Sequence, residues 1–186
     1  MPAYVDSISP LQVNALVPSG VSTGPQPLIV STAAGASALF TVTVNATEPG
    51  LLAPGNFKIG ETQYVVAQFP DGTYVAPPGA ISGGTSNVAQ PGDTIVIYGI
   101  GFGSVNPSMP PGQLVSQPNT LALPFTISFG GVAATSIAYD GLAPGYTGLY
   151  QFDVVVPLVP AGNAVPLTFT LNGTGGAQTL APAIGN

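Results

Sequence analysis

The sequence predicts an all-β protein of the sandwich type, and three observations support this prediction. Nearly a quarter of the 186 residues are Gly (25) or Pro (21), the residues that mark tight turns. The apolar residues, 45 % of the chain, fall in short runs between these turn residues and show no helical period. Part of the sequence is also repeated. Because disorder goes with low hydrophobicity and high net charge, this composition indicates a folded chain.

Period-two alternation is the main evidence for individual strands. Phe125–Phe129 places Phe and Ile on one face and Thr and Ser on the other, as expected of a strand with one face on a core. Thr94–Ile100 is almost continuously apolar, which is typical of a central strand. In chain order, the predicted strands are Leu11–Val17, Pro27–Ser31, Leu39–Val44, Thr62–Phe69, Thr94–Ile100, Phe125–Phe129, Thr135–Asp140, Leu149–Val156, Pro166–Leu171 and Gln178–Ala181.

Turn residues separate these strands. Clear turn signals are Pro91-Gly92-Asp93, Asp71-Gly72-Thr73, Gly130-Gly131 and Asn172-Gly173. The segment Gly101–Leu123 has no clear pattern, and we expect either a long surface loop or a functional loop there.

An internal repeat is the most informative feature of the sequence. The segment Gln12–Pro18 matches Gln151–Pro157, and each copy continues through a Gly-containing turn to a Pro-Leu pair that opens another strand. Ala3-Tyr4 likewise matches Ala138-Tyr139, with about four extra residues in the second copy. We therefore predict three parts: the C-terminal half of a module in residues 1–50, a β-hairpin connector in 51–79, and a complete β-sandwich in 80–186.

Half a sandwich cannot bury its own hydrophobic face. The predicted half-module must therefore pack on the rest of the chain, pair with another chain, or be the remainder of a longer protein. Unpaired strand edges invite the addition of further strands.

Three segments resemble the immunoglobulin-like IPT/TIG domains. Pro91–Gly103 is similar to the first-strand pattern of that family, Phe129–Thr135 to its "GG-V-x-A" hairpin, and Gln151–Gly162 to a later strand and turn. The longer order of motifs resembles the Solibacter-type uncharacterised C-terminal domain of secreted bacterial proteins. Those motifs are Glu48–Leu51, Asp71–Thr73, Pro91-Gly92, Gly141–Gly145 and Gly148–Gln151. The resemblance implies an IPT/TIG-type sandwich and an extracellular setting, and it transfers no catalytic residue.

The composition excludes several classes of function. The chain has no His, Cys or Trp, so it lacks the residues of Ser-His and Cys-His nucleophile systems, of the usual zinc sites and of disulfides. Lys58 is the only basic residue against seven acids, which argues against nucleic acid and anionic membrane surfaces as partners. No apolar stretch reaches the roughly 18 residues that a membrane span needs, and no signal peptide is recognisable at Met1.

Carboxylate pairs are the remaining route to acid–base chemistry. The candidates are Glu61, Asp71, Asp93, Asp140 and Asp153, and a carboxylate-based hydrolase would need two of them on one cleft. We favour a role in turns for Asp71, Asp93 and Asp140, because Asp in turns commonly accepts hydrogen bonds from nearby backbone. No calcium-loop motif is present, and we predict no catalytic residue, metal site or cofactor.

Tyrosines are the best candidates for contact with a ligand. Tyr146, Tyr150 and Tyr139, together with Tyr98, could form a platform for a glycan or a peptide, although packing at a sheet edge is the commoner role. Lys58 could form an isopeptide bond with an Asn, helped by Glu61, but a solvated lysine is the simpler interpretation. Asn45 and Asn172 lie in N-x-[ST] sequences that fit glycosylation acceptors.

These observations favour a non-enzymatic structural or adhesion module, secreted or at the cell surface. It would associate with itself or with another surface protein by strand-edge pairing or strand donation, in the extreme as a filament. The alternative is a carbohydrate-binding accessory module of a secreted protein, and the least favoured is a carboxylate-based hydrolase.

Overall fold

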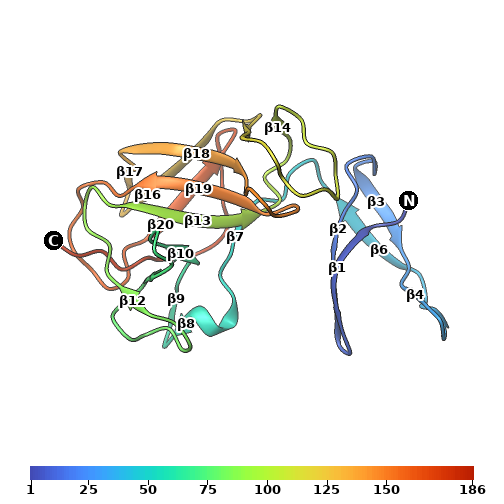
Figure 1. The fold of residues 1–186 in the computed structure, drawn as a ribbon, viewed down its shortest axis with the longest axis horizontal. Helices are drawn as coiled ribbons and strands as arrows, with labels where there is room; N and C mark the ends of the chain where they lie inside the picture. The colour runs from blue at the N-terminus through green and yellow to red at the C-terminus, as the bar shows by residue number, and fades with distance from the viewer. The chain divides into compact units, whose positions relative to one another are not determined.

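The computed structural model describes all 186 residues and is all-β, as the sequence predicts. Its only helical element is the 3-10 turn η1 (Gly55–Phe57). The chain divides into two compact units, residues 1–48 and residues 49–186, which we call unit 1 and unit 2 (Figure 1).

The larger sheet of unit 2 is built on the central strand β13. In β13 (Thr94–Ile100) every second side chain is buried, beginning with Ile95 and Ile97. It pairs antiparallel with β19 on one side and with β10 on the other. Around it the sheet comprises β7 (Gly50–Leu51), β10 (Ala67–Gln68), β11 (Tyr74–Val75), β12 (Ser86–Asn87), β18 (Ser136–Leu142) and β19 (Tyr150–Val155).

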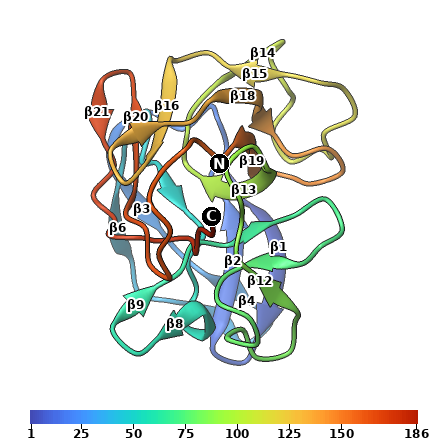
Figure 2. The same ribbon diagram turned by 90° about the vertical axis from the view of Figure 1, so that its left-hand side faces the viewer.

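The second sheet of unit 2 has the order β17-β16-β20-β21, and Figure 2 shows β16, β20 and β21 side by side. The bounds are β16 (Phe125–Phe129), β17 (Val132–Ala133), β20 (Leu167–Leu171) and β21 (Thr174–Gly175). Both long strands alternate as predicted, so Phe125, Ile127 and Phe129 are buried between the sheets. On the other face, the hydroxyls of Thr126 and Thr170 lie 2.8 Å apart.

Aromatic rings from both sheets form the core of unit 2. Phe152 of the larger sheet stacks on Phe125 of the smaller one, with ring centroids 4.3 Å apart. Phe102 is fully buried between them. Its ring lies edge-on to Phe125 and Phe152 and is tilted against Phe169. Such aromatic contacts add to the free energy gained by burying apolar area. The two sheets therefore share one continuous core.

Short ribbons and the C-terminal segment complete unit 2. These ribbons are β8 (Lys58–Ile59) with β9 (Thr62–Gln63), and β14 (Val105–Asn106) with β15 (Thr120–Leu121). The loop between β14 and β15 is fixed by the buried Asn119, whose Oδ1 accepts a hydrogen bond from the Leu142 amide at 2.7 Å. The region 101–123 is therefore tied to β18.

Unit 1 consists of two hairpins and a short ribbon. β1 (Tyr4–Ser9) pairs with β2 (Gln12–Leu16), and β3 (Gly24–Leu28) pairs with β6 (Phe40–Val44). The ribbon of β4 (Ser31–Thr32) and β5 (Gly35–Ala36) extends the second hairpin. Pro18 is the only buried residue of unit 1, so this unit has no hydrophobic core of its own.

Three predicted strands differ in the structure. The predicted strand Pro27–Ser31 is interrupted, because β3 ends at Leu28 and β4 begins at Ser31. The predicted strand Thr62–Phe69 is divided into β9 and β10, because Tyr64 and Val65 leave the ribbon to bond Phe57 and Ala181. The predicted strand Gln178–Ala181 forms only isolated bridges, at Leu180 and Ala181. In the segment predicted as a connector, 51–79, β7 and β10 both pair with β13, so this segment contributes to the larger sheet.

Candidate functional site in the open half-module

The sequence repeat is also a repeat of strand pairing. In the β1–β2 hairpin Val5 pairs with Ala15, and in the β18–β19 hairpin Ile137 pairs with Val154. Both hairpins have a bulge directly after this pair, at Asp6 and at Ala138. Gln12 and Gln151, which begin the matching sequences, pair with Ser9 and Gly141. The two hairpins therefore have the same register.

The structure corrects one part of the predicted alignment. Tyr4 lies opposite Leu16, whereas Tyr139 lies opposite Asp153, the equivalent of Asn14. The equivalent of Tyr139 is therefore Ser7, and Ala3-Tyr4 does not match Ala138-Tyr139. The difference lies in the turn: residues 10 and 11 join Ser9 to Gln12, whereas residues 142–150 join the equivalent Gly141 to Gln151.

The second hairpin of unit 1 also has a counterpart in unit 2. Leu28 pairs with Phe40, and the equivalent Leu167 pairs with Leu180. The far end corresponds too, with one extra residue in unit 2 before Leu167, since Gly24 pairs with Val44 and Gly162 bridges Ile184. Unit 1 is thus built like residues 136–184 of unit 2, without the strands that precede them.

Equivalent side chains have opposite environments in the two units. Val13 is 45 % exposed, whereas its equivalent Phe152 is fully buried. Phe40 is 66 % exposed, whereas Leu180 is 6 % exposed. In unit 2 the missing cover is supplied by β13, which pairs with β19, and by β16, which pairs with β20. The corresponding edges of β2 and β3 have no strand beside them.

We call the uncovered apolar surface of unit 1 the open face. Each of its side chains occupies a position whose equivalent in unit 2 carries a buried or core-facing side chain. The open face comprises Val5, Ile8, Val13, Ala15, Val17, Leu28, Val30, Phe40, Val42 and Val44. Asp6 and Glu48 are the only charged side chains of unit 1, and neither belongs to this face.

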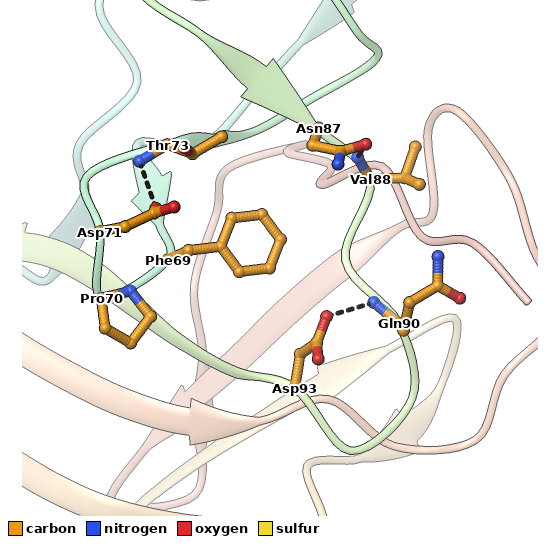
Figure 3. Close-up of a pocket in the computed structure, with 8 residues that line it drawn as sticks. All are labelled: Phe69, Pro70, Asp71, Thr73, Asn87, Val88, Gln90 and Asp93. Carbon is orange, nitrogen blue, oxygen red and sulfur yellow. Dashed lines mark hydrogen bonds between the residues drawn. The ribbon is translucent and has the colours of Figure 1, made fainter.

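Asp71 and Asp93 line an open hollow of about 480 Å³ in unit 2. Each carboxylate is held by the backbone of its own turn, as the sequence indicates for both. Asp71 Oδ1 accepts from the Thr73 amide at 2.9 Å, and this hydrogen bond lowers the pKa of Asp71. Asp93 Oδ2 accepts from the Gln90 amide at 2.7 Å. Figure 3 shows the two carboxylates on separate loops, where they fix turns.

The other candidate acids are dispersed. Asp140 lies within β18 and not at a strand end, so it has no turn role, and its partial burial raises its pKa. Asp153 Oδ1 accepts from Gln151 Nε2 at 2.8 Å, and Glu61 is exposed in the turn between β8 and β9. No three acidic groups converge on a point where they could hold a metal ion. Lys58 is exposed on β8.

The tyrosines divide between the core and one surface. Tyr150 is 7 % exposed, and its hydroxyl donates to the Gly103 carbonyl, so it is a core residue and not a ligand contact. Tyr139 lies on the outer face of β18 and donates to the Leu142 carbonyl at 2.6 Å. Tyr98 occupies the same outer face on β13, and Tyr146 is 57 % exposed on the loop before β19.

The outer face of the larger sheet thus carries a small polar and aromatic surface. Tyr98 pairs with Gln151, and Tyr139 pairs with Asp153, so these four side chains leave the sheet on one side. Burial raises the pKa of Tyr98, with smaller contributions from Tyr146 and Asp153 nearby. The structure places Tyr98 and Tyr139 on the same face of the sheet, with Tyr146 near Tyr98, and leaves Tyr150 on the opposite side.

Strand β1 is the part of the site that the sequence alone did not reveal. Its bulge at Asp6 breaks the period-two alternation of Tyr4–Ser9, so the pattern of Val5 and Ile8 is not recognisable as a strand. An alignment of the repeat extended backwards from Gln12 and Gln151 would have located it.

Comparisons with known proteins supply no relative. No protein-family model, no curated protein and no solved structure matches the chain. Among the helical elements, none is long and apolar enough to cross a membrane.

Proposed function

We propose that the protein is a non-enzymatic structural or adhesion module of the cell surface or extracellular space, and that unit 1 is its association site. The observation that carries this proposal is the contrast between equivalent positions, such as Phe40 at 66 % and Leu180 at 6 % exposed. Unit 1 has the strands and the apolar face of a sandwich half, and it lacks the strands that would cover them.

The mechanism is the addition of strands to unit 1. A partner strand beside β2 would satisfy the free backbone groups of that edge, as β13 does for β19. A second strand beside β3 would do the same, as β16 does for β20. Burial of half-exposed Val and Leu side chains would add about 1 kcal/mol each. No lysine protects either edge, although lysine commonly discourages strand pairing.

An immunoglobulin-like sandwich of the IPT/TIG type is part of the proposal. Unit 2 supports it with two mainly antiparallel sheets around one core. The "GG-V-x-A" motif, Gly130–Ala134, forms the turn from β16 into β17. The motif Val154–Pro157, which has the pattern "V-x-V-P", begins in β19 and reaches the buried Val156 and Pro157 directly after the strand.

A charged residue on the open face should prevent association. Phe40→Lys places an ammonium group where a partner must bury apolar surface, which we expect to shift the association midpoint at least about tenfold to higher concentration. Thr41→Lys is the matched control, since it adds the same charge to the neighbouring outward position of β6. Sedimentation equilibrium of both variants and the parent chain measures the effect. If Phe40→Lys and the parent chain associate with the same midpoint, the open face is not the association site.

Glycan binding is a second candidate function, favoured by the polar and aromatic surface of Tyr98, Tyr139 and Tyr146. Tyrosine rings beside the hydrogen-bonding groups of Gln151 and Asp153 suit a sugar, although there is no Trp to add a larger platform. If a glycan array detects binding, Tyr146→Ala should abolish it, and Tyr4→Ala, at an exposed tyrosine of unit 1, should not. Retention of binding in Tyr146→Ala would place the glycan elsewhere.

A further inference from the structure

The open face requires a cover of defined geometry, and unit 2 supplies the template. There β13 runs antiparallel to β19, and β16 runs antiparallel to β20. A partner that covers unit 1 must therefore provide two strands. One must pair antiparallel with β2 in the first sheet of the sandwich, and the other must pair antiparallel with β3 in the second sheet. Both strands must be apolar toward the core.

A second copy of unit 1 meets both requirements through one operation. A twofold axis perpendicular to two packed sheets places each edge strand antiparallel to its own copy. The same axis would thus pair β2 with β2 and β3 with β3 of the partner copy. Each sheet then continues from one copy into the other, and the open face of each sheet is covered by the opposite sheet, part of which the partner copy contributes.

The chemistry of the open face also favours an identical partner. The face is uncharged, and along β6 it alternates with polar positions, Phe40, Val42 and Val44 against Thr41 and Thr43. A charged partner would find no complementary group on it. The exposed apolar side chains of unit 2, such as Leu114 and Leu158, are single residues in loops and offer no matching strand.

We propose that unit 1 of two copies closes into a single sandwich about a twofold axis, with β1, β2, β3 and β6 contributed by each copy. This inference rests on the proposed function and adds the partner and the symmetry. It differs from strand donation, because no strand leaves its own chain and the contact closes on itself. A closed dimer results, and a filament does not.

The absence of cysteine makes the symmetry directly testable. In a twofold antiparallel pair, only the residue on the axis faces its own copy. A residue two positions away is separated from its copy by four residues, about 14 Å at the rise of a strand. A disulfide needs Cβ atoms about 3.5–4.5 Å apart, so a single cysteine can bridge two copies only close to the axis.

Each of the five residues of β2, Gln12–Leu16, is replaced in turn by cysteine in the full chain and oxidised at equal concentration. We expect disulfide-linked dimer to peak sharply at one position, about tenfold above positions two residues away, in accordance with that distance limit. Thr168→Cys is the control for random oxidation, because it is exposed on β20 of the complete sandwich. Light scattering of the parent chain runs in parallel.

The outcomes separate this inference from the proposed function. A sharp peak together with a dimer mass supports the twofold sandwich. A dimer or polymer without any peak above the Thr168→Cys level overturns the twofold sandwich and leaves association through unit 1 in place. A monomer at all concentrations, with no peak, overturns both.

Discussion

Phe152→Ala should lower the free energy of unfolding of unit 2 by about 3–5 kcal/mol, the usual range for removing a buried ring. The ring is fully buried, stacks on Phe125 and meets Phe102 at a centroid distance of 4.7 Å. Its loss leaves a cavity between two sheets that both contribute to the core, so neither sheet can collapse alone. Urea denaturation followed by circular dichroism measures the change.

The equivalent substitution in unit 1 provides the matched control. Val13 holds the same position in the repeat, yet it is 45 % exposed. Val13→Ala should therefore change the unfolding of the monomer by less than about 0.5 kcal/mol, as surface substitutions do. It should weaken association instead, because it trims the open face. A loss of monomer stability comparable with that of a core truncation would mean that Val13 is already covered within one chain, contrary to the open half-module.

The sequence predicted best the strands whose bounds follow from their own residues and from the turns that flank them. β13 and β16 have the predicted bounds, because a continuous apolar run in β13 and a period-two alternation in β16 each lie between strong turn signals. The strand predicted at Thr62–Phe69 is divided, because the bonds of Tyr64 and Val65 go to Phe57 and to the C-terminal segment. These hydrogen-bond partners depend on how the chain folds back on itself, so they cannot be predicted from the local sequence pattern. The isolated bridges of Leu180 and Ala181 have the same origin.

The candidate site was predictable in kind but not in detail. The repeat of Gln12–Pro18 predicted that the first strands lack the other half of a module, whereas the exposure of the open face required coordinates. The placement of Tyr150 was within reach of the sequence. Tyr150, Phe152 and Val154 alternate with Gln151 and Asp153, and this pattern places the tyrosine on the core side.

Gly141→Ala should destabilise unit 2 by about 3 kcal/mol, through overpacking and the loss of buried hydrogen bonds. A Cβ atom at Gly141 would stand 2.6 Å from Asn119 Oδ1 and closer still to the Asn119 carbonyl oxygen. Asn119 cannot move away cheaply, because it is 3 % exposed and its amide group bonds both the Leu142 amide and the Leu142 carbonyl. Backbone and side chain of the loop would both have to shift.

Gly175→Ala is the control for this substitution. Gly175 also lies in a strand, β21, its φ is not positive, and no atom stands within 4 Å of its Cβ position. Its replacement should be neutral or slightly stabilising, because alanine reduces the freedom of the unfolded chain. Thermal unfolding of both variants by circular dichroism compares them. Equal melting temperatures would show that the loop at Asn119 yields to β18, and that the segment 101–123 is not fixed to the sheet by this contact.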